Sequence, residues 1–209
     1  MATARNAKQA KRYHHGALRE GLVKAGLEIL EERGVEGLSL RACAERLGVS
    51  HAAPAHHFKS FKALTSALAA VGFRELGADL ATARQDELDP LAAVRAAFTA
   101  YLLFVGRHPE LFRLMFSAPR VDAEDDDLRA AAVAAYGELA ALAKPYHAKL
   151  GGRFSMTELQ VEQMIWSTIH GYAELYVGNQ IACSPDELGA LAVEAGKFAE
   201  ILEAAADGE

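Results

Sequence analysis

Apolar residues recur along most of this chain with the 3.6-residue period of amphipathic helices. The stretch at 15–33 shows the pattern most simply, because one face carries Leu18, Leu22, Ala25, Ile29 and Leu30. No stretch alternates apolar and polar residues for long enough to predict a strand, and the long segments are rich in Ala, Leu, Glu and Arg, which favour helices. The pattern therefore predicts an all-α fold.

Helix caps and helix breakers divide the chain into nine predicted helices. After the first helix at 15–33, Ser39 and Gly48 bound the second, and Ser50 is the predicted N-cap of a short third helix. Pro54 is tolerated in that helix because it takes the fourth position, where it forfeits at most the first intrahelical hydrogen bond. The other predicted starts are Ser60, Asp89 with Pro90, Pro109, the acidic run 122–127, Ser155 with Glu158, and Ser184 with Pro185 and Glu187.

The second and third predicted helices are separated by a tight turn, which is the spacing of a helix-turn-helix over residues 39–57. The short helix after the turn carries small residues, so it can enter the major groove of DNA while its partner crosses the backbone. The predicted DNA contacts are Ser39, Arg41, Ser50, His51, Ala52, Ala53, His56, Lys59 and Lys62. His57 is expected to pack inside the domain instead. Other three-helix bundles contain the same turn, so this spacing alone leaves a different function open.

The charge distribution distinguishes the same end of the chain. Residues 1–64 hold 11 Lys and Arg against 6 Asp and Glu, whereas residues 65–209 hold 11 against 22. Five of the eight histidines also fall in the first 64 residues. A basic region on an otherwise acidic chain is typical of nucleic-acid contact by one part of a molecule, and uneven surface charge without a ligand is the alternative.

The segment SLRACAERLGVSHAAPAHHFKSFKAL at 39–64 resembles the signature of the TetR family of bacterial transcriptional regulators. The resemblance extends over residues 15–75, and WSTIHG at 166–171 resembles a subgroup named for a Trp and a His-Gly pair. It implies a nine-helix architecture in which a three-helix DNA-binding domain at 15–75 precedes a larger helical domain at 76–209 for effector binding and dimerisation. Residues 1–14 are expected to form a flexible basic arm.

The resemblance also implies a function. A protein of this kind is expected to be a ligand-responsive regulator, usually a repressor, that binds a palindromic double-stranded operator as a dimer and is released by a small molecule. Two positions depart from the family pattern, because Ala55 replaces a tyrosine and Phe61 replaces a phosphate-binding lysine. We therefore expect either weaker operator binding or a larger number of operator contacts from the basic arm. A small-molecule- or partner-binding protein of the same fold, with weak or lost operator binding, is the alternative.

The last two predicted helices have more apolar surface than one core buries. The ninth has apolar residues at three- and four-residue spacing, which is the pattern of a helix-helix seam, and the eighth is apolar on two faces. A homodimer through a four-helix bundle is therefore expected, and a buried central helix in a monomer is the alternative. The predicted interface residues are Met164, Ile165, Thr168, Leu188, Leu191, Ala195, Phe198 and Leu202.

Large side chains are spread over the fifth to eighth predicted helices, and most of them must be ordinary core. Ligand sites between helices are typically apolar with few polar groups, and the family resemblance implies an effector cavity in this region. The candidate pocket residues are Tyr101, Phe104, Phe112, Met115, Phe116, Tyr136, Trp166, His170 and Tyr176. We expect a small apolar or aromatic effector, oriented by His170 and the tyrosine hydroxyl groups.

The sequence gives little indication of metal binding, catalysis, membrane insertion or secretion. Cys43 and Cys183 lie far apart, no HxxxH or CxxC pair is present, and the helix dipole explains the acidic residues at 124–127, so no metal is expected. No nucleophile is paired with a base and no glycine-rich phosphate loop is present, so we expect neither an enzyme nor a cofactor. The apolar runs are too short to span a membrane, and the N-terminus lacks the apolar segment of a secretory signal. A cytoplasmic location is expected.

Overall fold

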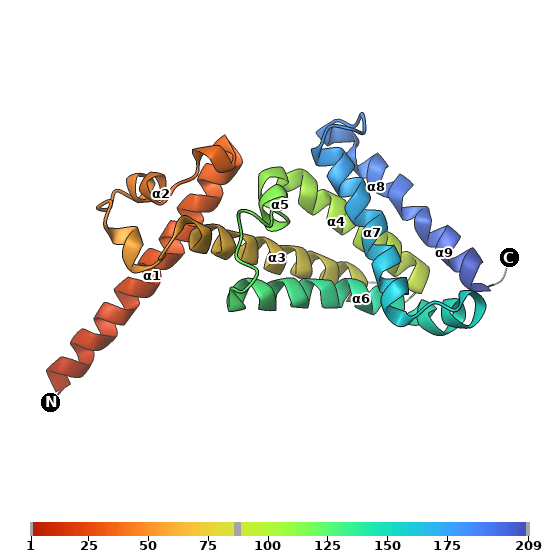
Figure 1. Ribbon diagram of the computed structural model, residues 1–209, viewed down its shortest axis with the longest axis horizontal. Coiled ribbons are helices and arrows are strands. Elements are labelled where there is room, and N and C mark those ends of the chain that lie inside the picture. The colour runs from red at the N-terminus through yellow and green to blue at the C-terminus, as the bar shows by residue number, and fades with distance from the viewer. Residues whose placement is uncertain (1, 86–88, 208–209) are drawn as a thin grey trace. The chain divides into compact units, whose positions relative to one another are not determined.

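The computed structural model describes residues 2–85 and 89–207, and within these ranges every regular element is a helix (Figure 1). The described residues form nine α-helices and three short 3-10 segments, which confirms the predicted all-α class. The chain divides into two compact units: Met1–Ala70 with Glu110–Leu128, and Val71–Pro109 with Arg129–Glu209. The first unit thus takes in a segment that we had assigned to the C-terminal domain.

The first unit is built on α1 (Ala2–Arg33), α2 (Leu40–Leu47), the start of α3 (Phe61–Gln85) and most of α5 (Pro109–Met115). The Ser39 side chain accepts a hydrogen bond from the Ala42 amide, as predicted for an N-cap. Gly48 ends α2 with a φ of 66°, a left-handed conformation in which glycine carries no steric cost. The buried side chains at the centre of this unit include Leu22, Ile29, Leu30, Cys43, Leu64 and Leu68.

The third predicted helix is instead a single 3-10 segment, Ala53–His56, whose N-cap is Ala52 rather than Ser50. Proline explains the change, because Pro54 has no N–H to donate to an earlier carbonyl group. Ser50 O accepts from the Ala53 amide at 2.9 Å, and Pro54 O accepts from the amides of His57 and Phe58. The segment after the turn is therefore shorter and tighter than an α-helix.

The start of α1 also differs from the expectation. The helix begins at Ala2 rather than near residue 15, so residues 2–14 are helical where we expected a flexible arm. Ala, Lys, Arg and Gln supply most of this stretch, and all four are strong helix formers.

The second unit is built on α4 (Pro90–Arg107), most of α6 (Asp126–Phe154), α7 (Glu158–Val177), α8 (Leu188–Gly196) and α9 (Phe198–Asp207). Asp89 caps α4 by accepting from the Ala92 amide at 2.8 Å, and Pro90 takes the first helical position, as predicted. Within this unit α4 packs along α8 and also contacts α7 and α9 (Figure 1). Its fully buried side chains, which form the centre of the unit, are Val94, Phe98, Tyr101, Leu102, Phe104 and Val105.

Two helix starts near the C-terminus were predicted at the wrong residues. The capping box of α7 is Thr157 with Gln160, not Ser155 with Glu158, because Ser155 has a φ of 55° and lies outside the helix. Ser184 and Glu187 do hydrogen-bond to each other, but a 3-10 turn at Pro185–Glu187 precedes α8. The single ninth helix that we predicted is interrupted at Lys197 into α8 and α9.

Candidate functional site

The predicted DNA-contacting residues lie on the accessible surface of the first unit. Seven of the nine are exposed, and Ser39 and Ala53 are half-buried. Two apolar side chains between them, Pro54 and Phe58, are buried and fix the segment to the core. His57 is half-buried, which agrees with the expectation that it packs inward more than His56 does. The turn segment thus presents small and polar side chains outward from a rigid base.

Glu45 on α2 lies between two of the predicted DNA contacts. Its Oε1 atom is 2.9 Å from Arg41 Nε and 3.3 Å from His51 Nε2, and all three side chains are at least half exposed. The hydrogen bond from Arg41 lowers the pKa of Glu45, so the carboxylate stays negatively charged. Sequence reasoning missed Glu45, although its four-residue spacing from Arg41 on one helix was a usable signal.

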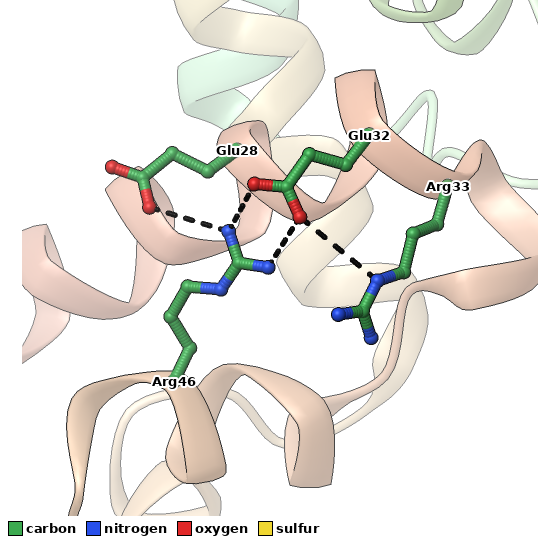
Figure 2. A network of polar contacts seen from close by, with 4 residues as sticks. All are labelled: Glu28, Glu32, Arg33 and Arg46. Atoms are coloured by element: carbon green, nitrogen blue, oxygen red, sulfur yellow. Dashed lines mark hydrogen bonds and ion pairs between the residues drawn. The ribbon is translucent and has the colours of Figure 1, made fainter.

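Arg46 joins α2 to α1 through a bidentate ion pair. Figure 2 shows its guanidinium group between the carboxylates of Glu28 and Glu32, with Arg33 on the far side of Glu32. Arg46 lowers the pKa of Glu32, chiefly through the hydrogen bonds that it donates. This network holds the first helix of the helix-turn-helix against its support, and we did not predict it, because sequence spacing does not reveal a contact between two helices.

A cation also covers the aromatic base of the turn segment. The Arg19 guanidinium lies 5.3 Å from the centroid of the Phe58 ring, within the range of a cation–π contact. The basic residues after it, Lys59 and Lys62, are exposed, and so is Phe61, the first residue of α3. Phe61 therefore occupies a position at which a longer polar side chain would reach solvent.

The segment after α5 docks onto the start of α3 within the first unit. The Thr65 hydroxyl group donates to Arg120 O at 2.5 Å, and Ser66 Oγ accepts from the Asp122 amide at 2.8 Å. Arg120 also forms an ion pair with Glu36 at 2.7 Å. Thr65 and Ser66 are fully buried polar residues, and these bonds satisfy them. Polar residues inside an apolar helical pattern were the only sequence signal for this contact.

Four of the predicted pocket residues meet in the second unit. Tyr101 on α4 hydrogen-bonds through its hydroxyl group to Nδ1 of His170 on α7 at 3.0 Å. The Trp166 ring lies 5.6 Å from His170 and 5.8 Å from Tyr136, between ring centroids. Burial lowers the pKa of His170 and raises that of Tyr101. This aromatic cluster, Tyr101, Tyr136, Trp166 and His170, is thus a neutral, largely apolar set with polar edges.

The other five pocket candidates are not brought into this cluster. Phe112, Met115 and Phe116 belong to the first unit, where the rings of Phe112 and Phe116 lie 5.1 Å apart. Phe104 is fully buried beside His108, and Tyr176 is half-buried near the end of α7.

The predicted dimer interface needs a correction. Ile165, Leu188, Ala195 and Leu202 are buried in the core of the second unit, because their helices use these positions to pack on α4 and on one another. They are therefore not available to a partner. Met164, Thr168, Leu191 and Phe198 remain half-buried. The large apolar side chains that α7, α8 and α9 do expose are Leu159, Leu175, Val193 and Ile201.

The described residues offer neither a metal site nor a membrane-spanning helix. Among the residues that the structure describes, no three His, Cys, Asp or Glu side chains are grouped so as to hold a metal ion. No helix in the described ranges has both the length and the apolar character to cross a membrane.

Comparison with known proteins gives matches over most of the chain. Residues 22–68 match the family described as "Bacterial regulatory proteins, tetR family", and residues 94–195 match "Tetracyclin repressor-like, C-terminal domain". Tetracycline repressor protein class C of Escherichia coli is 49% identical over 51 residues, which make up 24% of this chain and 23% of that repressor. The matched region therefore spans about a quarter of the length of this curated relative.

Solved structures extend the likeness to about nine-tenths of the chain. A protein of unknown function from Rhodococcus sp. RHA1 has a TM-score of 0.73 and 32% identity, covering 90% of this chain and 95% of that one. A TetR variant from Acinetobacter baumannii AYE, solved in complex with minocycline, has a TM-score of 0.57 and 18% identity, covering 87% and 94% of the two chains. The second likeness shows a shared fold.

Proposed function

Because the chain belongs to the TetR family of bacterial regulatory proteins, we propose that it is a dimeric transcriptional regulator, most simply a repressor, that binds a palindromic operator. The observation that carries the proposal is the exposed surface of the helix-turn-helix, where small and basic side chains surround a rigidly held turn. A regulator acts on DNA in the cytoplasm, and we propose no enzymatic activity and no cofactor for it.

In this proposal some of the exposed side chains contact DNA bases and others contact phosphate groups. Arg41 and His51 read base edges, because both lie beside the turn segment and both carry donors that match guanine acceptors in the major groove. Ala52 and Ala53 allow the backbone to approach closely. The groups that hold the phosphate backbone are Ser39, Ser50, His56, Lys59 and Lys62.

We further propose that the second unit binds the effector and forms the dimer. The aromatic cluster supports a small apolar or aromatic effector, because its rings, one fully buried and three half-buried, offer apolar surface and its His170–Tyr101 pair offers orienting polar groups. The minocycline complex of the Acinetobacter baumannii protein is a precedent for a small-molecule ligand in this fold. For the dimer, the exposed apolar side chains Leu159, Leu175, Val193 and Ile201 take the place of the four buried residues first considered.

Operator binding is tested by titrating the DNA upstream of the protein's own gene at several salt concentrations. The wild-type protein is expected to retard this fragment in preference to scrambled DNA. Lys62→Ala should reduce the slope of log K against log salt by about 1.8, because each of the two subunits loses one phosphate contact worth about 0.9, whereas Lys197→Ala at the break between α8 and α9 should leave it unchanged. Equal affinity for the upstream and scrambled fragments across the salt series would favour the alternative, a binding protein of this fold without an operator.

A further inference from the structure

A cleft of about 580 Å³ opens between α6 and α7, and none of its lining residues belongs to the aromatic cluster. Its volume is within the range of small-molecule sites in proteins. The polar lining comes from Lys144 and His147 on α6 and from Glu158 and Glu162 on α7. The remaining lining residues are small ones on α6, which leave room for an aliphatic group: Gly137, Ala140, Ala141 and Ala148.

The imidazole ring of His147 lies between the two glutamates. Nδ1 is 4.0 Å from Glu158 Oε2, and Nε2 is 3.8 Å from Glu162 Oε1, too far for a hydrogen bond in either case. Nε2 is buried and has no hydrogen-bond partner among the described residues. When the ring is neutral with its proton on Nδ1, two acceptors, Nε2 and the Glu162 carboxylate, face each other across 3.8 Å. A donor placed between them would satisfy both.

The charges around this gap favour a positively charged donor. Glu162 is largely buried, and the Tyr136 hydroxyl group donates to its Oε2 at 2.9 Å, which keeps one oxygen occupied and the other directed at the cleft. Burial and this carboxylate together raise the pKa of Tyr136 to about 12, so the tyrosine remains a neutral donor. With Glu158 added, the cleft holds two carboxylates against the single amine of Lys144.

We propose that the α6–α7 cleft binds a primary alkylammonium ion. The ammonium N–H groups donate to Glu162 Oε1 and to Nε2 of His147, Glu158 contributes a second negative charge, and the alkyl chain lies on Gly137, Ala141 and Ala148. Charge-assisted hydrogen bonds of this kind are about twice as strong as neutral ones, so they select the ammonium over an alcohol of equal size. The site is separate from operator binding and stands or falls independently of it.

The contacts around Glu162 also supply a readout. Tyr136, which donates to Glu162, packs edge-to-face on Trp166 at 5.8 Å between ring centroids, and Trp166 is the only tryptophan of the chain. A cation that binds to Glu162 therefore changes the environment of Trp166, whose fluorescence can report the binding.

The test titrates the full-length protein at pH 8 with hexylammonium, hexan-1-ol and hexanoate, three probes of matched size that differ in charge. Trp166 fluorescence and calorimetry should both report saturable binding of hexylammonium, at least tenfold tighter than that of either control compound. Glu162→Gln should weaken it at least tenfold, and Ala141→Leu, which fills the floor while leaving every charge in place, should do the same. Glu194→Gln, an exposed carboxylate on α8, should bind as wild type.

Three results would overturn the proposal: no saturable binding of hexylammonium to the wild-type protein, equal binding of hexanol or hexanoate, or unchanged affinity in both cleft variants. The last result would place the amine elsewhere, for example in the aromatic cluster. Circular dichroism of each variant confirms that the helices are intact, and the two variants act by different means, so a folding defect in one leaves the other informative.

Discussion

Arg46 on α2 donates two hydrogen bonds to the carboxylate of Glu32 on α1, from Nη1 to Oε1 at 2.7 Å and from Nη2 to Oε2 at 2.5 Å. The guanidinium group fits a carboxylate in this two-pronged geometry, and three-quarters of the Arg46 side chain is shielded from solvent. The pair connects α2, which carries the proposed DNA contact Arg41, with the long helix α1 that supports it. The surface that carries the predicted DNA contacts, which we call the reading surface, is thus fixed in place by an ion pair as well as by its apolar core.

This ion pair predicts a pH-dependent component of stability. The pKa of Glu32 is lowered in the folded state, so the stabilisation is present above its ordinary value of about 4.5 and is lost as the pH falls through the folded value. Arg46→Met removes the charge and should reduce the free energy of unfolding at pH 7 by more than at pH 3. Urea unfolding followed by circular dichroism at the two pH values measures the difference. Equal losses at both would show that Arg46 acts through packing alone.

The partly buried His170, which contacts Tyr101, predicts a second pH-dependent component of stability, in a higher pH range than that of Glu32. Burial lowers the pKa of His170, so the unfolded chain takes up a proton at a higher pH than the folded one. Stability should therefore fall on acidification as the pH passes through about 6.5, the ordinary value for histidine. His170→Asn should flatten this part of the profile. Melting temperatures between pH 8 and pH 5.5 test it, and a variant profile parallel to wild type would contradict it.

Removing the Tyr101 hydroxyl group tests the hydrogen bond between Tyr101 and His170 directly. Tyr101→Phe keeps the fully buried ring but takes away a hydrogen bond to His170. We expect the free energy of unfolding to fall by about 1–2 kcal/mol, the usual cost of one buried hydrogen bond with a polar partner left behind. Tyr172→Phe, on the half-exposed face of α7, is the matched control and should change stability by less than about 0.5 kcal/mol.

Close packing of α4 on α8 gives a further prediction. A Cβ atom added to Gly106 would overlap Cδ2 of Leu188, whose side chain is buried in the core of the second unit. Overpacking of this kind costs about 1–3 kcal/mol, which exceeds the roughly 1 kcal/mol that Ala gains over Gly in a helix. Gly106→Ala should therefore destabilise the protein in urea unfolding. Gly171→Ala on α7, where an added Cβ meets nothing within 4 Å, should be neutral or stabilising.

The local parts of this fold were readable from the sequence because their signals are local. The caps at Ser39 and Asp89 lie where hydroxyl and carboxylate residues precede apolar periodic stretches, and the structure places them there. Pro54 was judged tolerable in an α-helix, but a missing N–H near the start of so short a segment was enough to make it a 3-10 turn. Capping rules located the starts of α2 and α4, whereas a single proline decided the form of the short segment that follows α2.

The tertiary parts were not readable, for a different physical reason. Apolar residues at heptad-like spacing identify a face that packs but not what it packs against, so Ile165 and Leu202 were assigned to a partner when they belong to the core of their own unit. The contacts that dock residues 120–122 on Thr65 and Ser66 join positions about 55 apart in the chain. Nothing in the spacing of either segment encodes such a pairing.

The surface residue Phe61 offers a gain-of-function prediction for operator binding. It is 38% exposed at the first position of α3, next to Lys62, so replacement by lysine costs little folding energy and adds a charge at the edge of the reading surface. If that edge faces phosphate groups, Phe61→Lys should tighten binding at low salt and steepen the slope of log K against log salt by about 1.8, which is about 0.9 for each subunit of the dimer. Val133→Lys on α6, an equally tolerant exposed position in the second unit, adds the same charge and should leave the slope unchanged. Identical slopes for the two variants would mean that only the net charge matters, and the edge of α3 would then be excluded from the operator contact.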